Sequence, residues 1–296
     1  MIAENEFAAT TYRVLNKFAH EMTPSGTWNW KCVVKNGTKL PLAASFDEGF
    51  LQLACRSDAI CKTTLALEDA MLCNKMLAGG VKLALDPSSR SLHLRSDIVV
   101  LDELQLRDRL EWALQGFHDG NRLLKSPASH KDHRISQSAP VPDADLADLL
   151  RDISWSCAER EQNDFSADLD ASGAPPASIR MNGNSLVLSV ELLRCNATAD
   201  IARQALAIYL LTASCSLRMI RAYAEHTDDQ ICFGFHVSLP SCPAPEEIQH
   251  ALAALSVAYR TCARETAVLL HGAAAKHYLA ACNTSTTDDH QHDKEN

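Results

Sequence analysis

Cysteine and histidine are the residue types in this chain with the widest chemistry, because they bind metals, act as nucleophiles and carry protons. The sequence holds 11 cysteines and 12 histidines. No two cysteines have the Cys-x-x-Cys spacing of zinc knuckles and dithiol redox sites. Most stand beside apolar residues, as Cys73 and Cys232 do, where a thiol behaves as a small buried apolar group. The pattern therefore predicts buried thiols, and it leaves open one reactive thiol that it does not identify.

Two histidine groups have spacings that would suit a metal. They are His130 with His133, and His290 with His292 in an acidic run near the C-terminus. Both groups lie in segments without apolar periodicity, so no packed element would hold the ligands in place. We expect adventitious metal binding at most, and the sequence predicts no metal site and no cofactor.

Motifs of known catalytic chemistry are absent from the sequence. It contains no Gly-x-Gly-x-x-Gly, no P-loop, no Gly-x-Ser-x-Gly and no His-Glu-x-x-His. Two candidate acid–base pairs remain, Glu68-Asp69 and Glu225-His226, and charged residues on helix faces and in turns are usually solvated. The sequence therefore predicts no catalytic residue and no enzyme. A deep pocket with converging polar groups would reopen that alternative.

The composition is that of a globular protein with an acidic surface. Of the 296 residues, 46% are hydrophobic and 22% are charged, and the formal net charge is −9. Such a field repels nucleic acid and anionic membranes and favours a basic segment of another protein. No apolar run approaches the roughly 20 residues that span a bilayer, and the N-terminus is acidic where a signal peptide is basic. These features predict a cytoplasmic protein.

One segment divides the chain into two parts of similar size. From Lys125 to Asp143 the sequence holds three prolines, four serines and only two large aliphatic residues, Ile135 and Val141. This segment cannot bury itself and is predicted to be a linker. The predicted boundaries are 1–125 for a first module, 126–142 for the linker, 143–272 for a second module and 273–296 for a C-terminal segment. From Asn283 onward that segment is polar and is predicted to be disordered.

Apolar periodicity outlines the same first elements in both modules. A stripe from Phe7 to Met22 predicts a helix that ends before Pro24, and a matching stripe runs from Leu146 to Cys157. Alternating apolar residues then predict three strands in each module, and Asn36-Gly37 predicts a hairpin turn after the first strand of the first module. The predicted strands cover 28–34, 40–44 and 50–55 in the first module, and 165–169, 179–181 and 186–192 in the second.

The later elements match at a nearly constant distance along the chain. Helices are predicted over 62–78 and 198–217, and two strands and a last helix follow in each module. An offset of 139 relates the strands, as it relates Val81 to Ile220, and an offset of 142 relates the last helices. We therefore predict an α+β protein of two tandem α-β-β-β-α-β-β-α modules with antiparallel sheets.

The first module resembles a known family. The segment 76–87, with Gly79-Gly80 before a strand, the strand 92–100 and the amphipathic helix 105–124 resemble the second half of the type III secretion chaperone fold. The second module has Arg218-Met219 in place of the two glycines, and family members are usually about half as long as this chain. The family consists of small acidic proteins that hold secretion substrates as homodimers. The resemblance thus implies one chain packed as an intrachain pseudo-dimer.

This architecture predicts a non-enzymatic module that holds an extended segment of a partner protein, because strand edges and apolar grooves suit extended peptides. A regulatory or adaptor protein with the same fold and no role in secretion is the alternative. The candidate contact residues are apolar members of the early strands and first helix, although such residues are more often core. They are Val14, Phe18, Trp28, Trp30, Leu40, Leu42, Phe46, Phe50 and Leu51, with Ile179, Leu186, Leu188 and Val190.

Overall fold

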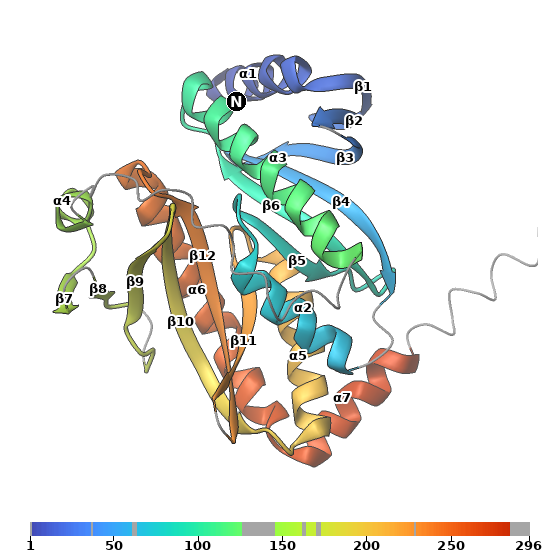
Figure 1. The fold of residues 1–296 in the computed structure, drawn as a ribbon, viewed down its shortest axis with the longest axis vertical. Helices are drawn as coiled ribbons and strands as arrows, with labels where there is room; N and C mark the ends of the chain where they lie inside the picture. Colours follow the sequence, from blue (N-terminus) through green and yellow to red (C-terminus); the bar gives the residue numbers. More distant parts are fainter. Residues whose placement is uncertain are drawn as a thin grey trace, which may run out of the picture.

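The fold is α+β, with two six-stranded antiparallel sheets and seven helices among the described residues (Figure 1). The computed structural model describes residues 2–36, 38–60, 64–125, 146–161, 164–169, 173–227 and 229–284. The class is the one that the sequence predicted. None of the helices in these ranges combines the length and the apolar character needed to cross a membrane. The predicted linker at 126–142 and the tail from 285 lie outside the described residues.

The first half of the chain, residues 2–125, contains one sheet and three helices. Its strand order is β1-β2-β3-β4-β6-β5, with α1 before the sheet, α2 between β4 and β5, and α3 after β6. The bounds are α1 Ile2–Phe18, β1 Ala19–Gly26, β2 Asn29–Asn36, β3 Thr38–Asp47, β4 Phe50–Ile60, α2 Thr64–Met76, β5 Val81–Leu85, β6 Ser91–Val99 and α3 Glu103–Lys125.

The second half, residues 146–284, contains the other sheet and four helices. Read from its outer edge, its strand order is β7-β8-β9-β10-β12-β11. The bounds are α4 Leu146–Arg151, β7 Cys157–Glu161, β8 Asp164–Ala167, β9 Ala177–Asn182, β10 Ser185–Asn196, α5 Asp200–Ser216, β11 Arg221–Thr227, β12 Gln230–Pro240, α6 Pro245–Leu269 and α7 Gly272–Thr284.

Side-chain alternation and turn chemistry explain the strands. On β2, the inward members Trp30, Cys32 and Val34 are all at most 5% exposed, as expected of a strand with one face on the core. The turn between β3 and β4 places Glu48 and Gly49 at φ 46° and 82°. Two positive φ values define the type I′ turn, whose twist matches that of the strands it joins.

Each sheet has one strand more than the sequence predicted, because the first helices are shorter. Helix α1 ends at Phe18, and Ala19–Gly26 forms β1, which pairs antiparallel with β2. Pro24 disfavours helix at the residue before it, and a hairpin pairing is available instead. Met22 packs against the core from the strand. The position of Met22 therefore fitted a longer first helix as well as it fitted a strand.

The same correction applies to the second half. Helix α4 ends at Arg151, and Cys157, predicted on that helix, begins β7 and pairs with Ala167 of β8. Helix α7 was not predicted. It packs on α5 and α6 and includes Asn283, the first residue of the tail that was expected to be disordered.

The pairing registers of the two sheets correspond residue for residue over four strands. Adding 135 to each partner in the first sheet gives a pair in the second. The matching pairs are Met22↔Cys32 with Cys157↔Ala167, Trp30↔Ala44 with Phe165↔Ile179, and Phe46↔Leu51 with Met181↔Leu186.

The last two strands keep the correspondence with different offsets. The pair Leu83↔Leu94 corresponds to Ala222↔Phe235, so the offset is 139 for β5 and β11 and 141 for β6 and β12. The sequence had assigned 139 to both, which matched Leu94 to Phe233. The difference arises because the β11–β12 hairpin continues pairing to Thr227↔Gln230, with only two residues between its strands.

Helices cover one face of each sheet. Helix α3 lies along β4, β5 and β6, and α6 lies along β10 and β12 (Figure 1). Gly79 allows α3 to come close, since a Cβ there would lie 2.3 Å from the carbonyl oxygen of Trp112. Gly80 has a φ of 65°, and Met219, 139 residues later, has a φ of 60°. The left-handed conformation is thus kept where the second half has no glycine.

Candidate binding site at the junction of the two halves

The two halves meet through the edge strands β5 and β11 and the helices α2 and α5. Helix α5 packs on β5, α2 packs on β11, and the two helices pack on each other. The buried side chain of Asn74 on α2 links both strands, because its Nδ2 donates to the backbone oxygens of Leu83 and Ala222, each at 2.9 Å. We call this contact region the junction.

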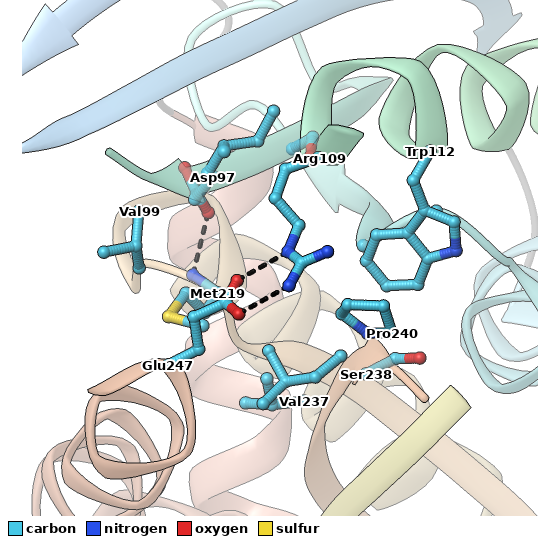
Figure 2. Close-up of a pocket in the computed structure, with 14 residues that line it drawn as sticks. Asp97, Val99, Arg109, Trp112, Met219, Val237, Ser238, Pro240 and Glu247 are labelled. Carbon is cyan, nitrogen blue, oxygen red and sulfur yellow. Dashed lines mark hydrogen bonds and ion pairs between the residues drawn. The ribbon is translucent and has the colours of Figure 1, made fainter. Parts of the chain in front are cut away.

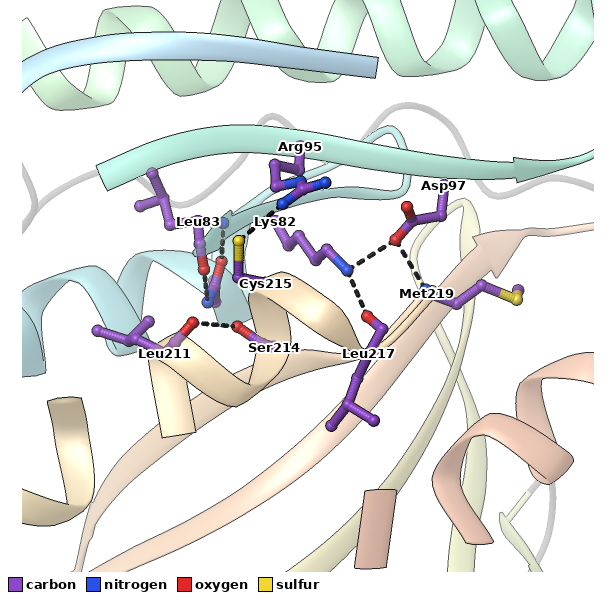
Figure 3. Close-up of polar contacts among 10 residues, drawn as sticks. Lys82, Leu83, Arg95, Asp97, Leu211, Ser214, Cys215, Leu217 and Met219 are labelled. Carbon is purple, nitrogen blue, oxygen red and sulfur yellow. Dashed lines mark hydrogen bonds and ion pairs between the residues drawn. The ribbon is translucent and has the colours of Figure 1, made fainter. Parts of the chain in front are cut away.

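A buried lysine crosses the junction from the first half (Figure 3). Lys82 of β5 is 1% exposed, and its Nζ donates to Asp97 Oδ2 and to the backbone oxygen of Leu217, each at 2.6 Å. Asp97 Oδ2 also accepts from the backbone N–H of Met219 at 2.9 Å. Burial lowers the pKa of Lys82, and Asp97 opposes that shift. The ammonium therefore has a carboxylate partner and lies just beyond the negative end of α5.

A buried arginine crosses the junction in the opposite direction. Arg221 of β11 is 1% exposed, and its Nη1 donates to the backbone oxygen of Leu77 at 2.6 Å and to that of Asn74 at 3.4 Å. These carbonyls lie at the end of α2. Burial lowers the pKa of Arg221 to about 9, so the guanidinium stays charged at neutral pH. Its Nε and Nη2 have no hydrogen-bond partner within the described part of the chain.

Three ion pairs surround these cations and join the halves. Arg109 on α3 donates through Nε and Nη2 to both carboxylate oxygens of Glu247, each at 2.8 Å (Figure 2). Arg203 on α5 makes the same bidentate pair of hydrogen bonds with Glu68 through Nε and Nη2. The third pair joins Lys75 Nζ to Glu225 Oε1 at 2.6 Å. Glu68 had been interpreted as solvated, and it is in fact 2% exposed because Arg203 from the other half neutralises it.

Beside the Arg109–Glu247 pair lies a small hollow. Trp112, Met219 and Ser238 are among the residues around it (Figure 2). Its volume is about 30 Å³, which is room for a water molecule and not for a substrate.

A larger cleft opens on the other side of Trp112. We define the cleft as the hollow of about 800 Å³ between the outer face of the second sheet, the end of α2 and the middle of α3. Pockets of 300 to 1,000 Å³ are usual for small ligands. The charged, aromatic and hydroxyl side chains in its lining include Lys75, Arg180, Ser189, Arg221, Tyr223, Glu225, His236 and Ser238.

The floor of the cleft carries a neutral histidine beside the charged Arg221. His236 is directly opposite Arg221 in the β11–β12 pairing and stacks on Tyr223 with ring centroids 5.5 Å apart. Burial, with a smaller contribution from Arg221, lowers the pKa of His236 well below its ordinary value. His236 therefore adds no charge at neutral pH. The lining side chains include three cations, Lys75, Arg180 and Arg221, against the single carboxylate of Glu225.

A second hollow lies at the far end of the first sheet. We call it the aromatic groove: about 490 Å³ between α1 and the β1–β2 turn, with Tyr12, Trp28 and Trp30 in its lining. Tyr12 is 42% exposed, and its ring centroid is 6.0 Å from that of Trp30. Trp28 sits in the two-residue turn at φ 56°, and its carbonyl accepts from the N–H of Phe46 at 2.9 Å.

Most of the predicted contact residues lie inside the protein. Phe18, Trp28 and Phe50 are partly exposed, and Trp28 lines the aromatic groove together with the buried Trp30. The others form the core of the two sheets, which the sequence allowed as the commoner outcome. These buried residues are Val14, Trp30, Leu40, Leu42, Phe46, Leu51, Ile179, Leu186, Leu188 and Val190.

Ser91, Cys32 and Cys262 lack the surroundings of an activated nucleophile. Ser91 Oγ lies 3.0 Å from His93 Nε2, and Asp86 Oδ2 lies 3.8 Å from the same nitrogen. A triad needs the carboxylate on the other ring nitrogen. Burial raises the pKa of Cys32 and of Cys262 to about 11, which disfavours the thiolate. No cluster of three His, Cys, Asp or Glu side chains occurs in the described ranges.

The sequence analysis missed Arg221, His236 and Tyr12. Arg221 and Lys82 carried a usable signal, because each is a cation inside an apolar strand and the two are 139 residues apart. A charge that recurs at matching buried positions indicates a paired or functional group. Nothing in the sequence indicated that Tyr12 would be exposed beside the two tryptophans.

Comparison with known proteins identifies no relative: no protein-family model matches the chain, and no curated protein matches it in sequence. The functional argument therefore depends on the geometry of the junction, the cleft and the aromatic groove.

Proposed function

We propose that this protein is a non-enzymatic, chaperone-like module that holds an extended segment of a partner protein. In this proposal two copies of one α+β unit are fused in one chain and pack as an intrachain pseudo-dimer in the cytoplasm, as the resemblance to secretion chaperones implies. The aromatic groove is the binding surface.

Register supports the duplication. The strand order is the same in both halves, and four strands keep one offset of 135 in their pairings. A register slip of one residue would turn every side chain to the other face, so it is strongly specified. An independent origin of the two sheets would not require the same register.

Reciprocal packing supports the pseudo-dimer. Helix α2 covers β11 while α5 covers β5, so each half offers the same elements to the other. Lys82 reaches the end of α5, and Arg221 reaches the end of α2. In a two-fold dimer each contact occurs twice with the roles of the subunits exchanged. The junction repeats that arrangement within one chain.

The observation that carries the binding function is the exposed aromatic surface of the groove. Tyrosine and tryptophan rings supply large contact areas at low entropic cost and are enriched where proteins bind each other. The groove lies beside the hairpin of β1, an edge strand with an exposed face. An extended segment can pair with such an edge through its backbone while its side chains enter the groove.

The test is selection of 12-residue peptides from a displayed library, followed by fluorescence anisotropy with Trp28→Gly. Glycine accepts the positive φ of this turn, so the substitution removes the ring with little strain on the backbone. We expect peptide affinity to fall at least about tenfold, because a central aromatic contributes more than 1 kcal/mol.

Glu48→Gly is the matched control, since Glu48 also has a positive φ of 46° and lies outside the groove. It should bind the selected peptides as the parent protein does. Selection of no peptide, or equal affinity in Trp28→Gly and the parent, would contradict the proposal.

A further inference from the structure

The buried guanidinium of Arg221 has one edge unused. Its Nη1 is occupied by the carbonyls at the end of α2, while Nε and Nη2 have no partner among the described residues. A buried donor without a partner costs about 1–3 kcal/mol, and more when it is charged. Arg221 lines the cleft and is 1% exposed, so the missing acceptor would come from a ligand group that enters the inner end of the cleft.

The unused edge is the one with which this protein binds carboxylates elsewhere. Arg109, Arg194 and Arg203 each donate through Nε and Nη2 to the two oxygens of one glutamate. This parallel pair of bonds matches the planar fork of a carboxylate. Arg221 has the same edge and no carboxylate opposite it.

The first half shows which group is missing. Lys82 is opposite Arg95 in the β5–β6 pairing, and its carboxylate partner Asp97 lies two residues further along β6. Arg221 is opposite His236, so the residue two further along β12 is Ser238. The second half therefore has a hydroxyl, open to the cleft, at the place where the first half has a carboxylate.

The charges around the cleft also favour an anion. Lys75 and Glu225 neutralise each other at 2.6 Å, which leaves Arg180 and Arg221 as uncompensated charges in the lining. The molecule as a whole carries a net charge of −9. A cationic hollow in an acidic protein attracts anionic ligands locally.

We propose that the cleft binds an organic carboxylate, whose two oxygens accept hydrogen bonds from Nε and Nη2 of Arg221 in the place that Asp97 fills for Lys82. Ser238 and Ser189 offer hydroxyls to the rest of the ligand, and Trp112 offers an apolar surface. The site is separate from the aromatic groove, so it stands whether or not the groove binds peptides.

Isothermal titration calorimetry on the full chain tests this with named probes. They are glutarate, its neutral diamide, inorganic phosphate, and a capped peptide with one glutamate together with its glutamine counterpart. We expect glutarate or the glutamate peptide to bind and the neutral counterparts not to bind. The peptide arm separates a free acid from a carboxylate on a polypeptide.

Two variants locate the binding. Arg221→Lys keeps a cation that can reach the carbonyl of Leu77, as Lys82 reaches that of Leu217. A lysine has no pair of parallel N–H donors, so it cannot bind a carboxylate in the bidentate way. We expect at least about a tenfold loss of affinity, because bonds to charged groups are the strong ones. Ser189→Leu narrows the cleft beside His236, the partner of Ser189 in the β10–β12 pairing, and leaves Arg221 in place, so it should also weaken binding. Ser238→Asp should compete with the ligand by supplying the carboxylate internally.

Circular dichroism melts of each variant establish that a loss of binding is not a loss of fold. The proposal is overturned if no carboxylate probe binds the parent protein at 10 mM, a concentration well above the roughly millimolar limit of weak specific binding. It is equally overturned if phosphate binds more tightly than every carboxylate, or if folded Arg221→Lys binds the carboxylate as tightly as the parent.

Discussion

Lys82 and Arg221 occupy corresponding places in the two halves and have different surroundings. Lys82 has a carboxylate from its own sheet and a carbonyl at the end of the opposite helix. Arg221 has only the carbonyls, a neutral histidine beside it and an open cleft. Two halves with the same strand order can thus hold one cation for stability and leave the other with unpaired donors. The difference depends on a single position, Asp97 in one sheet and Ser238 in the other.

Removing the carboxylate that pairs with Lys82 should have the largest effect. Asp97→Asn leaves Lys82 buried without a counter-ion, and we expect the free energy of unfolding to fall by about 3–5 kcal/mol. Urea denaturation measures it. Glu191→Gln is the control, because its pair with Arg194 is exposed and is worth less than about 1 kcal/mol. A loss below about 1 kcal/mol for Asp97→Asn would show that the Lys82 charge is not buried as described.

The second prediction places an aspartate at position 238 of the second half, which corresponds to Asp97 in the first half. Ser238→Asp should raise the free energy of unfolding by about 1–2 kcal/mol, because a bond between charged groups outweighs the desolvation of one carboxylate here. The same measurement in an Arg221→Met background, which has no cation at this position, should show less than half of that gain. A destabilised Ser238→Asp protein would mean that the guanidinium edge does not face Ser238.

The smallest expected effect is on how the free energy of unfolding changes with pH through His236. Because burial lowers the pKa of His236, the folded chain keeps it neutral while the unfolded chain protonates it near pH 6.5. Stability is therefore full above that pH and falls as the pH decreases below it, by at most about 1.4 kcal/mol per pH unit from one group. His236→Phe keeps a ring beside Tyr223 and should flatten the curve between pH 7 and 5. Parallel curves for the two proteins would contradict this assignment.

Local sequence signals were sufficient for most of the elements. The alternation of Trp30, Cys32 and Val34 and the hairpin turns predicted strands correctly, because a one-sided core requires a period of two. Met22 and Cys157 were assigned to helices because a strand that starts after a short helix can keep the same apolar spacing. The outermost strands β1 and β7 were therefore found only in the structure, where pairing with a neighbour decides between the two conformations.

The candidate sites were less predictable than the fold. Apolar pattern selects residues such as Leu186 and Val190 that a folded chain buries, so the list of contact residues was mostly a list of the core. Phe18, Trp28 and Phe50 were the exceptions, and of these Trp28 lines the aromatic groove, to which Tyr12 comes from another element. The burial of Arg221 could not be predicted from its neighbours in sequence, because it depends on contact with the first half.

The sequence by itself determined the class, the approximate elements and the division into two similar parts, because periodicity and turn chemistry act over a few residues. Only the tertiary structure decided which charges are buried, since Glu68, Lys82 and Arg221 each have partners more than 130 residues away. Burial and pairing are properties of groups that the fold brings together. The unused edge of Arg221 exists only after that contact has formed.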